Sequence, residues 1–380
     1  MRGNLRKPIL ALIFLLALAA LAYRSRHAIH LGDFTWSKFA HAVSQANVPL
    51  LLLAIVGIYV CYGIRALRWQ RFSRYLGPSK YWNMYSGTVI GFAAIFLLGR
   101  PGELVRPIVL ARKDNLPTSG MFGIYVVERL FDFGSAIGLA VLSLLVFPRQ
   151  LAEAGVDPDA IAAARHGGWV LVGVLALVIA LLVYFRLHGA GALNRILERW
   201  RAAGGWRAKS VRTIVGFSEG LQAIRSIPDL AMAVVYSAIH WTLVVFIFLW
   251  ITRAFGDAFS DMNLPGAMLL LAVTLVGSAL QLPGVGGGAQ VGSFIALTTI
   301  FGIEQEPAAV AAIVLWLITF ASSTLAGIPL LIHEGLSMGE LRQLARAEAE
   351  AEKKGGHIAV PGLSGKSSFG AKNDPGEHPK

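Results

Sequence analysis

Apolar runs long enough to cross a lipid bilayer recur along almost the whole chain. A spanning helix needs about 20 such residues, because each residue adds about 1.5 Å of rise. Hydrophobic residues make up 55% of the chain and charged residues only 15%, whereas an average globular domain has about 25% charged residues. We therefore predict an all-α fold, a polytopic integral membrane helical bundle over residues 1–335. Residues 336–380 form a tail that is too polar from about residue 355 onward to fold on its own.

The formal net charge of +12 fits contact with membrane lipids better than contact with nucleic acid. The basic residues lie beside the apolar runs, where they fix topology and meet anionic lipid head groups. Cys61 is the only cysteine, so neither an intrachain disulfide nor a cysteine-based metal cluster is available. Only His27 and His30 are close together among the histidines, and no third ligand accompanies them. Since a P-loop and a nucleophile elbow are also missing, we expect no cofactor, no metal and no enzymatic activity.

The distribution of Lys and Arg between the runs predicts the topology, because short loops rich in these residues stay in the cytoplasm. Ala20-Leu21-Ala22 resembles a signal-peptidase site, but the basic residues directly after it favour a retained first helix. Both termini are then expected in the cytoplasm. The crossing runs are predicted at Pro8–Tyr23, Val48–Ile64, Ser119–Phe147, Trp169–Phe185, Leu230–Ile251 and Ala308–Ile332.

Two other apolar runs, Met84–Leu98 and Gly266–Gln281, break off into glycine- and proline-rich motifs. The loops on both sides of the first run are basic, whereas those on both sides of the second lack a basic excess. We therefore expect two re-entrant elements, the first entering from the cytoplasm and the second from outside, as in an inverted repeat. Gly87 and Gly91 have the spacing that lets helices pack closely. The motif residues are Gly99, Arg100, Pro101, Gly102 and Glu103 in the first break, and Pro283, Gly284, Gly286, Gly287, Gly288 and Gln290 in the second.

Paired breaks of this kind indicate a solute site near the middle of the bilayer. A broken helix exposes backbone amides at an N-terminus, and their partial positive charge suits a phosphate or a carboxylate. Arg100 and Arg106 flank the first break and have the geometry to donate bidentate hydrogen bonds to phosphate oxygens. The alternative is that the glycines only permit tight packing and that the arginines extend to the membrane surface. For the two breaks taken together we favour an anionic ligand.

Ionisable residues in and after the first break form a further set of candidates. Glu103 has three options: it binds a proton or cation, accepts hydrogen bonds from the amides of the turn, or pairs with Arg100 or Arg106. Glu128, Arg129 and Asp132 lie within five residues of a predicted span, where ionisable groups must face the bundle interior and pair. This cluster is either a buried ion pair that fixes helix packing or a gate or head-group contact.

Four segments carry a resemblance to a known family: Arg65-Ala66-Leu67-Arg68-Trp69, Gly99–Pro107, Glu128–Asp132 and Pro283–Gly288. With these segments in this order, the chain resembles the flippase-like membrane domain of lysylphosphatidylglycerol synthases over about residues 8–332. The resemblance implies a helical bundle with re-entrant helices in a bacterial inner membrane, a lipid or lipid-linked substrate, and movement of that lipid across the bilayer. It adds Arg65, Arg68 and Trp69 as secondary site residues.

Two departures from the family pattern limit what the resemblance implies. The family often has an acidic residue just after the second glycine turn, where this chain has Gln290, so a proton-linked role there is not expected. The residues after Gly335 are too few for the aminoacyl-transfer domain of the synthases, so the chain is not expected to make that lipid by itself.

We therefore expect an integral membrane transporter of the flippase type that moves an anionic or polyprenyl-phosphate-linked lipid. Arg100, Arg106 and the glycine turns would hold the head group, while Glu103 and the Glu128–Asp132 cluster would gate. The alternative is a non-transporting partner that presents a lipid to a separate glycosyl- or aminoacyl-transferase. The expected partners are the bilayer, the lipid substrate, and a second copy of the chain or a lipid-modifying enzyme.

Overall fold

The computed structural model describes residues 35–156, 159, 161–162, 166–170, 172–177, 180, 223–278, 281–282 and 286–334. The predicted first helix at Pro8–Tyr23 and the tail after residue 335 lie outside the described residues, and the predicted run Trp169–Phe185 is described only in part. The side chains of Arg100 and Pro101, and all of Pro283 and Gly284, also lie outside them.

Five helical segments in the described part of the chain are long and apolar enough to cross a membrane. They establish an all-α, multi-pass membrane protein, as the apolar runs predict. Polar N-caps begin two of them: the side chain of Asn47 accepts a hydrogen bond from Leu50 N, and that of Ser226 accepts one from Asp229 N. The segments are α3 (Val48–Ser73), α4 (Tyr81–Leu98), α6 (Thr118–Val141) continued by η2 (Leu142–Val146), α10 (Ile227–Arg253), and α13 (Gln305–Trp316) continued by η5 (Leu317–Ala321) and α14 (Ser323–His333).

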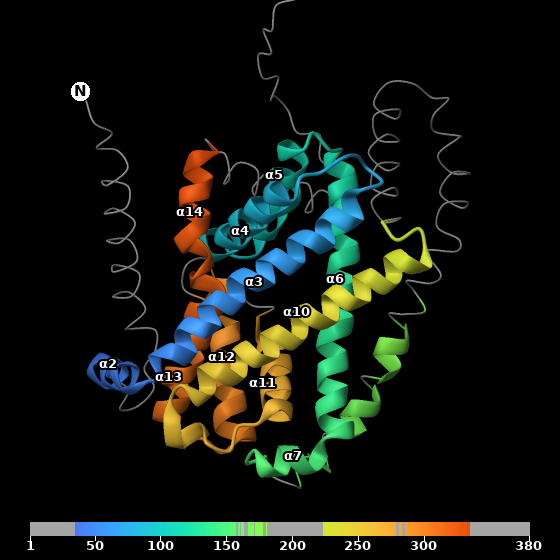
Figure 1. Ribbon diagram of the computed structural model, residues 1–380. Coiled ribbons are helices and arrows are strands. Elements are labelled where there is room, and N and C mark those ends of the chain that lie inside the picture. The colour runs from blue at the N-terminus through green and yellow to red at the C-terminus, as the bar shows by residue number, and fades with distance from the viewer. Residues whose placement is uncertain are drawn as a thin grey trace, which may run out of the picture.

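The helices α3 and α10 lie antiparallel and side by side across the bundle (Figure 1). At one end the backbone N–H of Asn47 donates to Ala254 O at 2.7 Å. At the other end Arg71 Nε lies 3.1 Å from Asp229 Oδ1. The second of these ends, where α5 (Val105–Lys113) also ends, is called the α5 end below. The opposite end holds α7 (Pro148–Glu153), α2 (Trp36–Gln45) and η3 (Gly256–Phe259), and is called the α7 end.

The first break makes a helical hairpin that starts and finishes at the α5 end. Helix α4 ends at Gly99, whose φ of 71° is a left-handed conformation that glycine adopts without strain. The chain continues through η1 (Arg100–Leu104) into α5, which runs back along α4. The two ends of this hairpin meet where Asn83 Nδ2 donates to Asp114 Oδ1 at 2.6 Å. We call residues 81–113 the first hairpin.

Glycines allow the two arms of the first hairpin to approach closely. A Cβ on Gly91 would lie 2.5 Å from the Cβ of Arg106, and one on Gly87 would lie 2.4 Å from a Leu110 methyl carbon. At the tip, a Cβ on Gly102 would lie 2.2 Å from the carbonyl oxygen of Ala94. The close packing that the Gly87 and Gly91 spacing predicts is therefore present.

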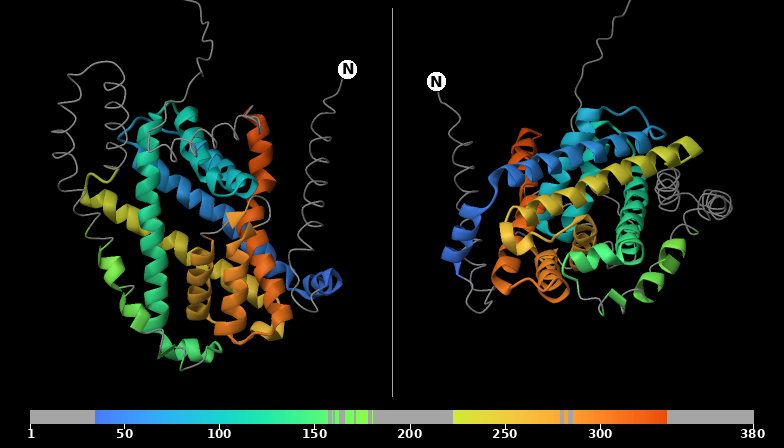
Figure 2. Two further views of the ribbon diagram at one scale, coloured as in Figure 1. Left: turned by 180° about the vertical axis from the view of Figure 1, so that it is seen from behind. Right: turned by 60° about the horizontal axis from the view of Figure 1, so that its bottom comes forward.

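The second break makes another hairpin, which starts and finishes at the α7 end (Figure 2). Helix α11 (Leu264–Gly277) is followed by the short strands β1 (Gln281–Leu282) and β2 (Gly286–Gly287), and then by α12 (Gly288–Ile295) and η4 (Ala296–Ile300). Helix α11 ends four residues before the predicted Gln281, because Gly277 packs directly on Gly288 and the chain must turn there. We call residues 264–300 the second hairpin.

The two hairpins meet in the interior of the bundle. Phe96 near the tip of the first, Ala289 at the start of α12 and Trp316 on α13 form one buried cluster. The rings of Phe96 and Trp316 lie 5.4 Å apart between centroids. The two hairpins thus start at opposite ends of the bundle and come together at this cluster, next to α13.

The prediction that a span stops at Ile64 and gives way to a basic loop was wrong. Helix α3 continues to Ser73, and Arg65 and Arg68 are buried within it. A hydropathy pattern ends a span at the first charges, but these two charges are neutralised by carboxylates of another helix. Burial of an arginine inside a bundle becomes tolerable when such a partner lies within hydrogen-bond reach.

Candidate functional site

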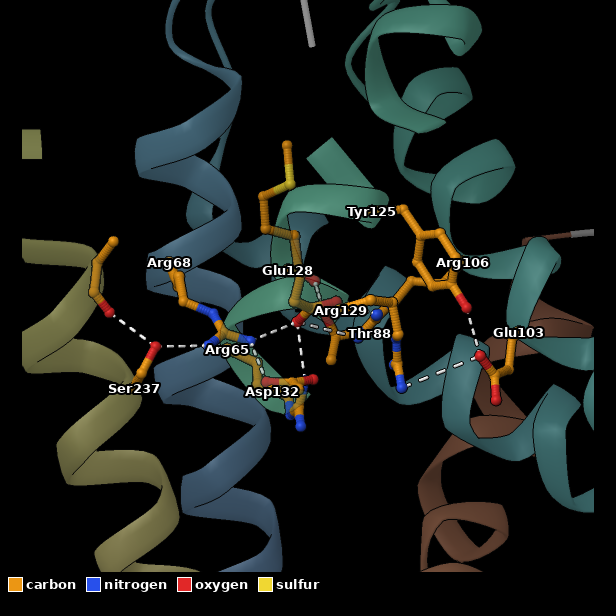
Figure 3. A network of polar contacts seen from close by, with 12 residues as sticks. Arg65, Arg68, Thr88, Glu103, Arg106, Tyr125, Glu128, Arg129, Asp132 and Ser237 are labelled. Atoms are coloured by element: carbon orange, nitrogen blue, oxygen red, sulfur yellow. Dashed lines mark hydrogen bonds and ion pairs between the residues drawn. The ribbon is translucent and has the colours of Figure 1, made fainter. Parts of the chain in front are cut away.

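Five charged side chains from three helices meet inside the α5 half of the bundle (Figure 3). They are Arg65 and Arg68 of α3, Arg106 of α5, and Glu128 and Asp132 of α6, and all five are buried. We call them the buried charge network. Arg65 and Arg68 are three residues apart, and Glu128 and Asp132 four, so each pair occupies one helix face and the two faces meet.

The network is built from four crossed ion pairs between α3 and α6. Arg65 Nη1 lies 2.8 Å from Glu128 Oε1 and 2.9 Å from Asp132 Oδ2. Arg68 Nη2 lies 2.9 Å from Glu128 Oε1 and 2.9 Å from Asp132 Oδ1. Arg68 also donates through Nη1 to Ser237 Oγ on α10 at 2.8 Å. Each carboxylate thus accepts from both arginines, and the network ties three long helices together.

Arg106 enters the network from the first hairpin. Its guanidinium pairs with Glu128, whose carboxylate therefore contacts three arginines. The Arg106 guanidinium carbon also lies 5.0 Å from the ring centroid of Trp69 and 5.5 Å from that of Phe92. Rings at this distance attract a cation through their negative faces. The fully buried Trp69 thus lines the site. Through Arg106, the first hairpin contacts both Trp69 of α3 and Glu128 of α6.

Glu103 and Arg129 lie at the edge of the network. Tyr125 donates its hydroxyl hydrogen to Glu103, and Arg129 Nη1 lies 3.9 Å from Glu103 Oε2. The side chain of Arg129 is 30% exposed and that of Glu103 16% exposed, whereas that of Glu128 is fully buried. Glu103 therefore pairs with Arg129, and Arg106 with Glu128. The sequence predicted Arg100 or Arg106 as the arginine partner of Glu103, but the partner found is Arg129 of α6. Arg106 pairs with Glu128 instead, and the side chain of Arg100 lies outside the described residues.

The charges of the buried network do not balance. Three arginines (Arg65, Arg68 and Arg106) face two carboxylates (Glu128 and Asp132), which leaves one positive charge in excess. In addition, the Nε atoms of Arg65 and Arg68 are buried without a hydrogen-bond partner among the described residues. Taking a charge out of water is strongly unfavourable unless an opposite charge compensates it. The arrangement therefore favours binding of an anion beside these arginines.

Among the predicted site residues, the structure brings together Arg65, Arg68, Trp69, Glu103, Arg106, Glu128, Arg129 and Asp132. Gly102 packs on the backbone of α4 at the tip of the first hairpin. The predicted residues of the second break lie elsewhere. Gly286 and Gly287 make up β2, Gly288 begins α12, and Gln290 Oε1 accepts a hydrogen bond from Gly287 N at 2.7 Å. The second break approaches the first hairpin at Phe96, through Ala289.

Tyr125 and Ser237 were missed from the sequence. Tyr125 lies three residues before Glu128 and so shares its helix face, which is a signal that spacing carries. Ser237 and His240 are polar residues within the apolar run of α10, and both are buried. A polar residue inside a span usually faces the bundle interior, but which helix it meets depends on the fold.

Comparison with protein families shows the family of the chain. The family model described as "Lysylphosphatidylglycerol synthase TM region" matches residues 9–327. The chain therefore belongs to this family, in agreement with the resemblance seen in the sequence. A search of curated proteins found no match.

Proposed function

We propose that this member of the family moves an anionic or polyprenyl-phosphate-linked lipid across the cytoplasmic membrane of a bacterium. The observation that carries the proposal is the excess of buried arginine over buried carboxylate beside the first break. An anionic head group would supply the missing negative charge. Guanidinium groups suit this role because they bind phosphate oxygens with paired hydrogen bonds.

The paired hairpins support a transport role. We infer that both are re-entrant, the first from the cytoplasmic face and the second from outside, because arginines and lysines gather at the α5 end. Irregular backbone at membrane depth is tolerated where protein buries it or where it lines a cavity. A path past the tips of the two hairpins would expose the head group to each face in turn.

The contacts of Arg106 suggest how a head group would enter the network. If a phosphate displaces Glu128 from Arg106, Glu128 keeps its ion pairs with Arg65 and Arg68. No buried charge is then left without a partner, so the exchange avoids the penalty of an isolated ion. Glu103 and Arg129, at the more exposed edge of the network, would act as a gate. We propose no chemical step for the chain, which would act as a transporter and not as an enzyme.

A flipping assay with the purified chain in proteoliposomes tests the proposal. The substitution Arg106→Ala should slow flipping of a fluorescent phosphatidylglycerol about 10- to 100-fold, because hydrogen bonds to charged groups contribute about 1.5–3 kcal/mol. The fold should survive, because the network without Arg106 has two arginines and two carboxylates. Arg112→Ala is the matched control, since Arg112 is an exposed arginine of the same helix.

The assay also separates the two functions considered. Unchanged flipping by the Arg106→Ala variant would contradict the assignment of the site. Binding of anionic lipid by the unaltered chain without any flipping would favour the alternative, a partner that presents its lipid to a separate glycosyl- or aminoacyl-transferase. Copurification with such an enzyme would support that alternative further.

A further inference from the structure

A second cluster of arginines lies at the α5 end, where α3 finishes and α10 begins. Its members are Arg71, Arg74, Tyr75, Arg225 and Asp229, and we call them the junction cluster. Asp229 is buried and holds the cluster together. It accepts from Arg71 Nε at 3.1 Å and from the Tyr75 hydroxyl at 2.6 Å, and its Oδ1 lies 2.7 Å from Arg74 Nη2.

Positive charge is in excess in the junction cluster. Among the described residues, the cluster has one carboxylate, that of Asp229, which pairs with Arg71 and Arg74. Arg225 lies over the Tyr75 ring, so three arginines stand against one carboxylate, an excess of two charges. The guanidinium carbons of Arg74 and Arg225 both lie 4.5 Å from the centroid of the Tyr75 ring. Two cations on one ring repel each other unless an anion or water screens them.

The arginines of the junction cluster also have donors to spare. Arg71 contacts Asp229 through Nε, and within the described residues its terminal nitrogens make no hydrogen bond. The side chains of Arg71 and Arg74 are 34% and 36% exposed, and Arg225 is exposed as well. The cluster therefore differs from the buried charge network, since a head group can reach it without any displacement of a helix.

Apolar side chains continue from the junction cluster along both helices. Leu67 on α3, and Ile227, Leu230 and Val234 on α10, are exposed large hydrophobic residues. Positive charge at the membrane surface above an exposed apolar face complements a lipid that has an anionic head and acyl chains. A free phosphate ion would use only the first of these two features.

We propose that the junction cluster binds the head group of an anionic bilayer lipid in the leaflet at the α5 end. Arginines recur every third residue along the end of α3 and at its C-cap, as Arg65, Arg68, Arg71 and Arg74, so this outer site leads along the helix to the buried charge network. Binding at the outer site stands on the contacts of the cluster alone. Onward movement of the lipid to the buried network rests on the proposed function.

Equilibrium binding of a fluorescent phosphatidylglycerol to the purified full-length chain in neutral detergent tests this site. Since each basic residue near a membrane surface contributes about 1 kcal/mol, Arg225→Gln should weaken binding about fivefold and the pair Arg74→Gln with Arg225→Gln about 25-fold. Arg225→Gln leaves every contact of Asp229 in place. Arg112→Gln, at the same end of the molecule, is the control and should leave binding unchanged.

A variant with the opposite effect separates lipid binding from a merely structural clasp. Asp229→Asn removes the only carboxylate of the junction cluster and should tighten phosphatidylglycerol binding about fivefold. A structural role predicts a lower unfolding temperature and no gain in affinity. Unchanged affinity in the Asp229→Asn and Arg225→Gln variants, both folded, would overturn the proposal.

Two further measurements fix the identity of the ligand. Phosphatidylcholine with the same acyl chains should bind much more weakly, and millimolar inorganic phosphate should not displace phosphatidylglycerol. Equal binding of phosphatidylcholine, or full displacement by phosphate, would overturn the assignment to an anionic lipid. The Arg106→Ala variant should keep the component of binding that Arg225→Gln weakens, even where flipping is lost. Failure of the proposed function is therefore distinguishable from failure of this site.

Discussion

The two hairpins are built alike in their backbones and differ in their chemistry. Each turns at a glycine with a left-handed backbone, Gly99 with φ of 71° and Gly287 with φ of 115°. Each also has a glycine on which a Cβ would lie 2.2 Å from a carbonyl oxygen, Gly102 in the first and Gly277 in the second. The shared features show that close backbone approach is what both breaks require.

The side chains beside the two breaks separate the hairpins. The first contributes Arg106 to the buried charge network and Glu103 to its edge. The second is joined by neutral groups: the hydroxyls of Thr274 and Ser293 lie 2.8 Å apart, and Gln290 holds the turn. Glycine-rich breaks in a membrane protein are thus not sufficient to indicate a charged site. At the two breaks, the ion pairs belong to the first hairpin, whereas the second hairpin is held by hydrogen bonds between neutral groups.

Substitution of Glu128 should lower the stability of the fold more than any other change, and it best tests whether the two hairpins differ in their charges. Glu128→Gln leaves three buried arginines against Asp132 alone, and an uncompensated buried charge destabilises a fold by about 3–5 kcal/mol. Ser293→Ala in the second hairpin removes two neutral contacts, those of its hydroxyl with Thr274 and with Ala289 O, and should lower stability by only about 1 kcal/mol. Thermal unfolding of the purified variants in detergent measures both.

A second substitution tests whether unbalanced charge causes the loss of stability in Glu128→Gln. In the Glu128→Gln background, Arg106→Gln removes one of the excess positive charges and should recover part of the lost stability. Equal destabilisation by Glu128→Gln and Ser293→Ala would mean that the two hairpins do not differ in the way described. An ion pair at the surface offers a further reference: Glu306→Gln, which breaks the contact with Lys38, should change stability by less than about 1 kcal/mol.

Substitution of the tip glycines should affect the two hairpins alike. Gly102→Ala and Gly277→Ala both force a Cβ against backbone, so each should lower stability by about 1–3 kcal/mol. Gly138→Ala on α6 is the control, because no atom lies within 4 Å of its added Cβ and alanine favours a helix by up to about 1 kcal/mol. A tolerated alanine at either tip, measured by the same unfolding assay, would show that close approach is not needed there.

The sequence predicts features that depend on residues near one another in the chain, but not those that depend on the packing of distant helices. Apolar runs and loop charges predict the helices, and they predict that the two hairpins start at opposite ends. The four-residue spacing of Glu128 and Asp132 predicts that these carboxylates act together. Their arginine partners could not be found this way, because Arg65 and Arg68 lie about 60 residues earlier in the chain. The pairing exists only once α3 and α6 pack together.

Local patterns also misplace residues whose surroundings are set by another helix. The span that begins at Val48 was expected to end before Arg65, because hydropathy assigns a buried arginine its full penalty. Gln290 shows the reverse case. The sequence shows only that an amide stands where the family often has an acidic residue, and it does not reveal that this side chain caps α12 at Gly287.

Substitution of Gln290 should change stability and flipping least. It also tests most directly whether only the first hairpin contacts the lipid head group. Gln290→Ala removes one hydrogen bond to Gly287 N and should lower stability by about 1 kcal/mol. Gln290→Glu keeps an acceptor in the same place, and a carboxylate near the N-terminus of α12 is favourable, so stability should not fall. Both variants should flip anionic lipid at close to the rate of the unaltered chain. If Gln290→Ala abolished flipping while the protein stayed folded, the second hairpin would also contact the head group, and recognition would be shared between the two breaks.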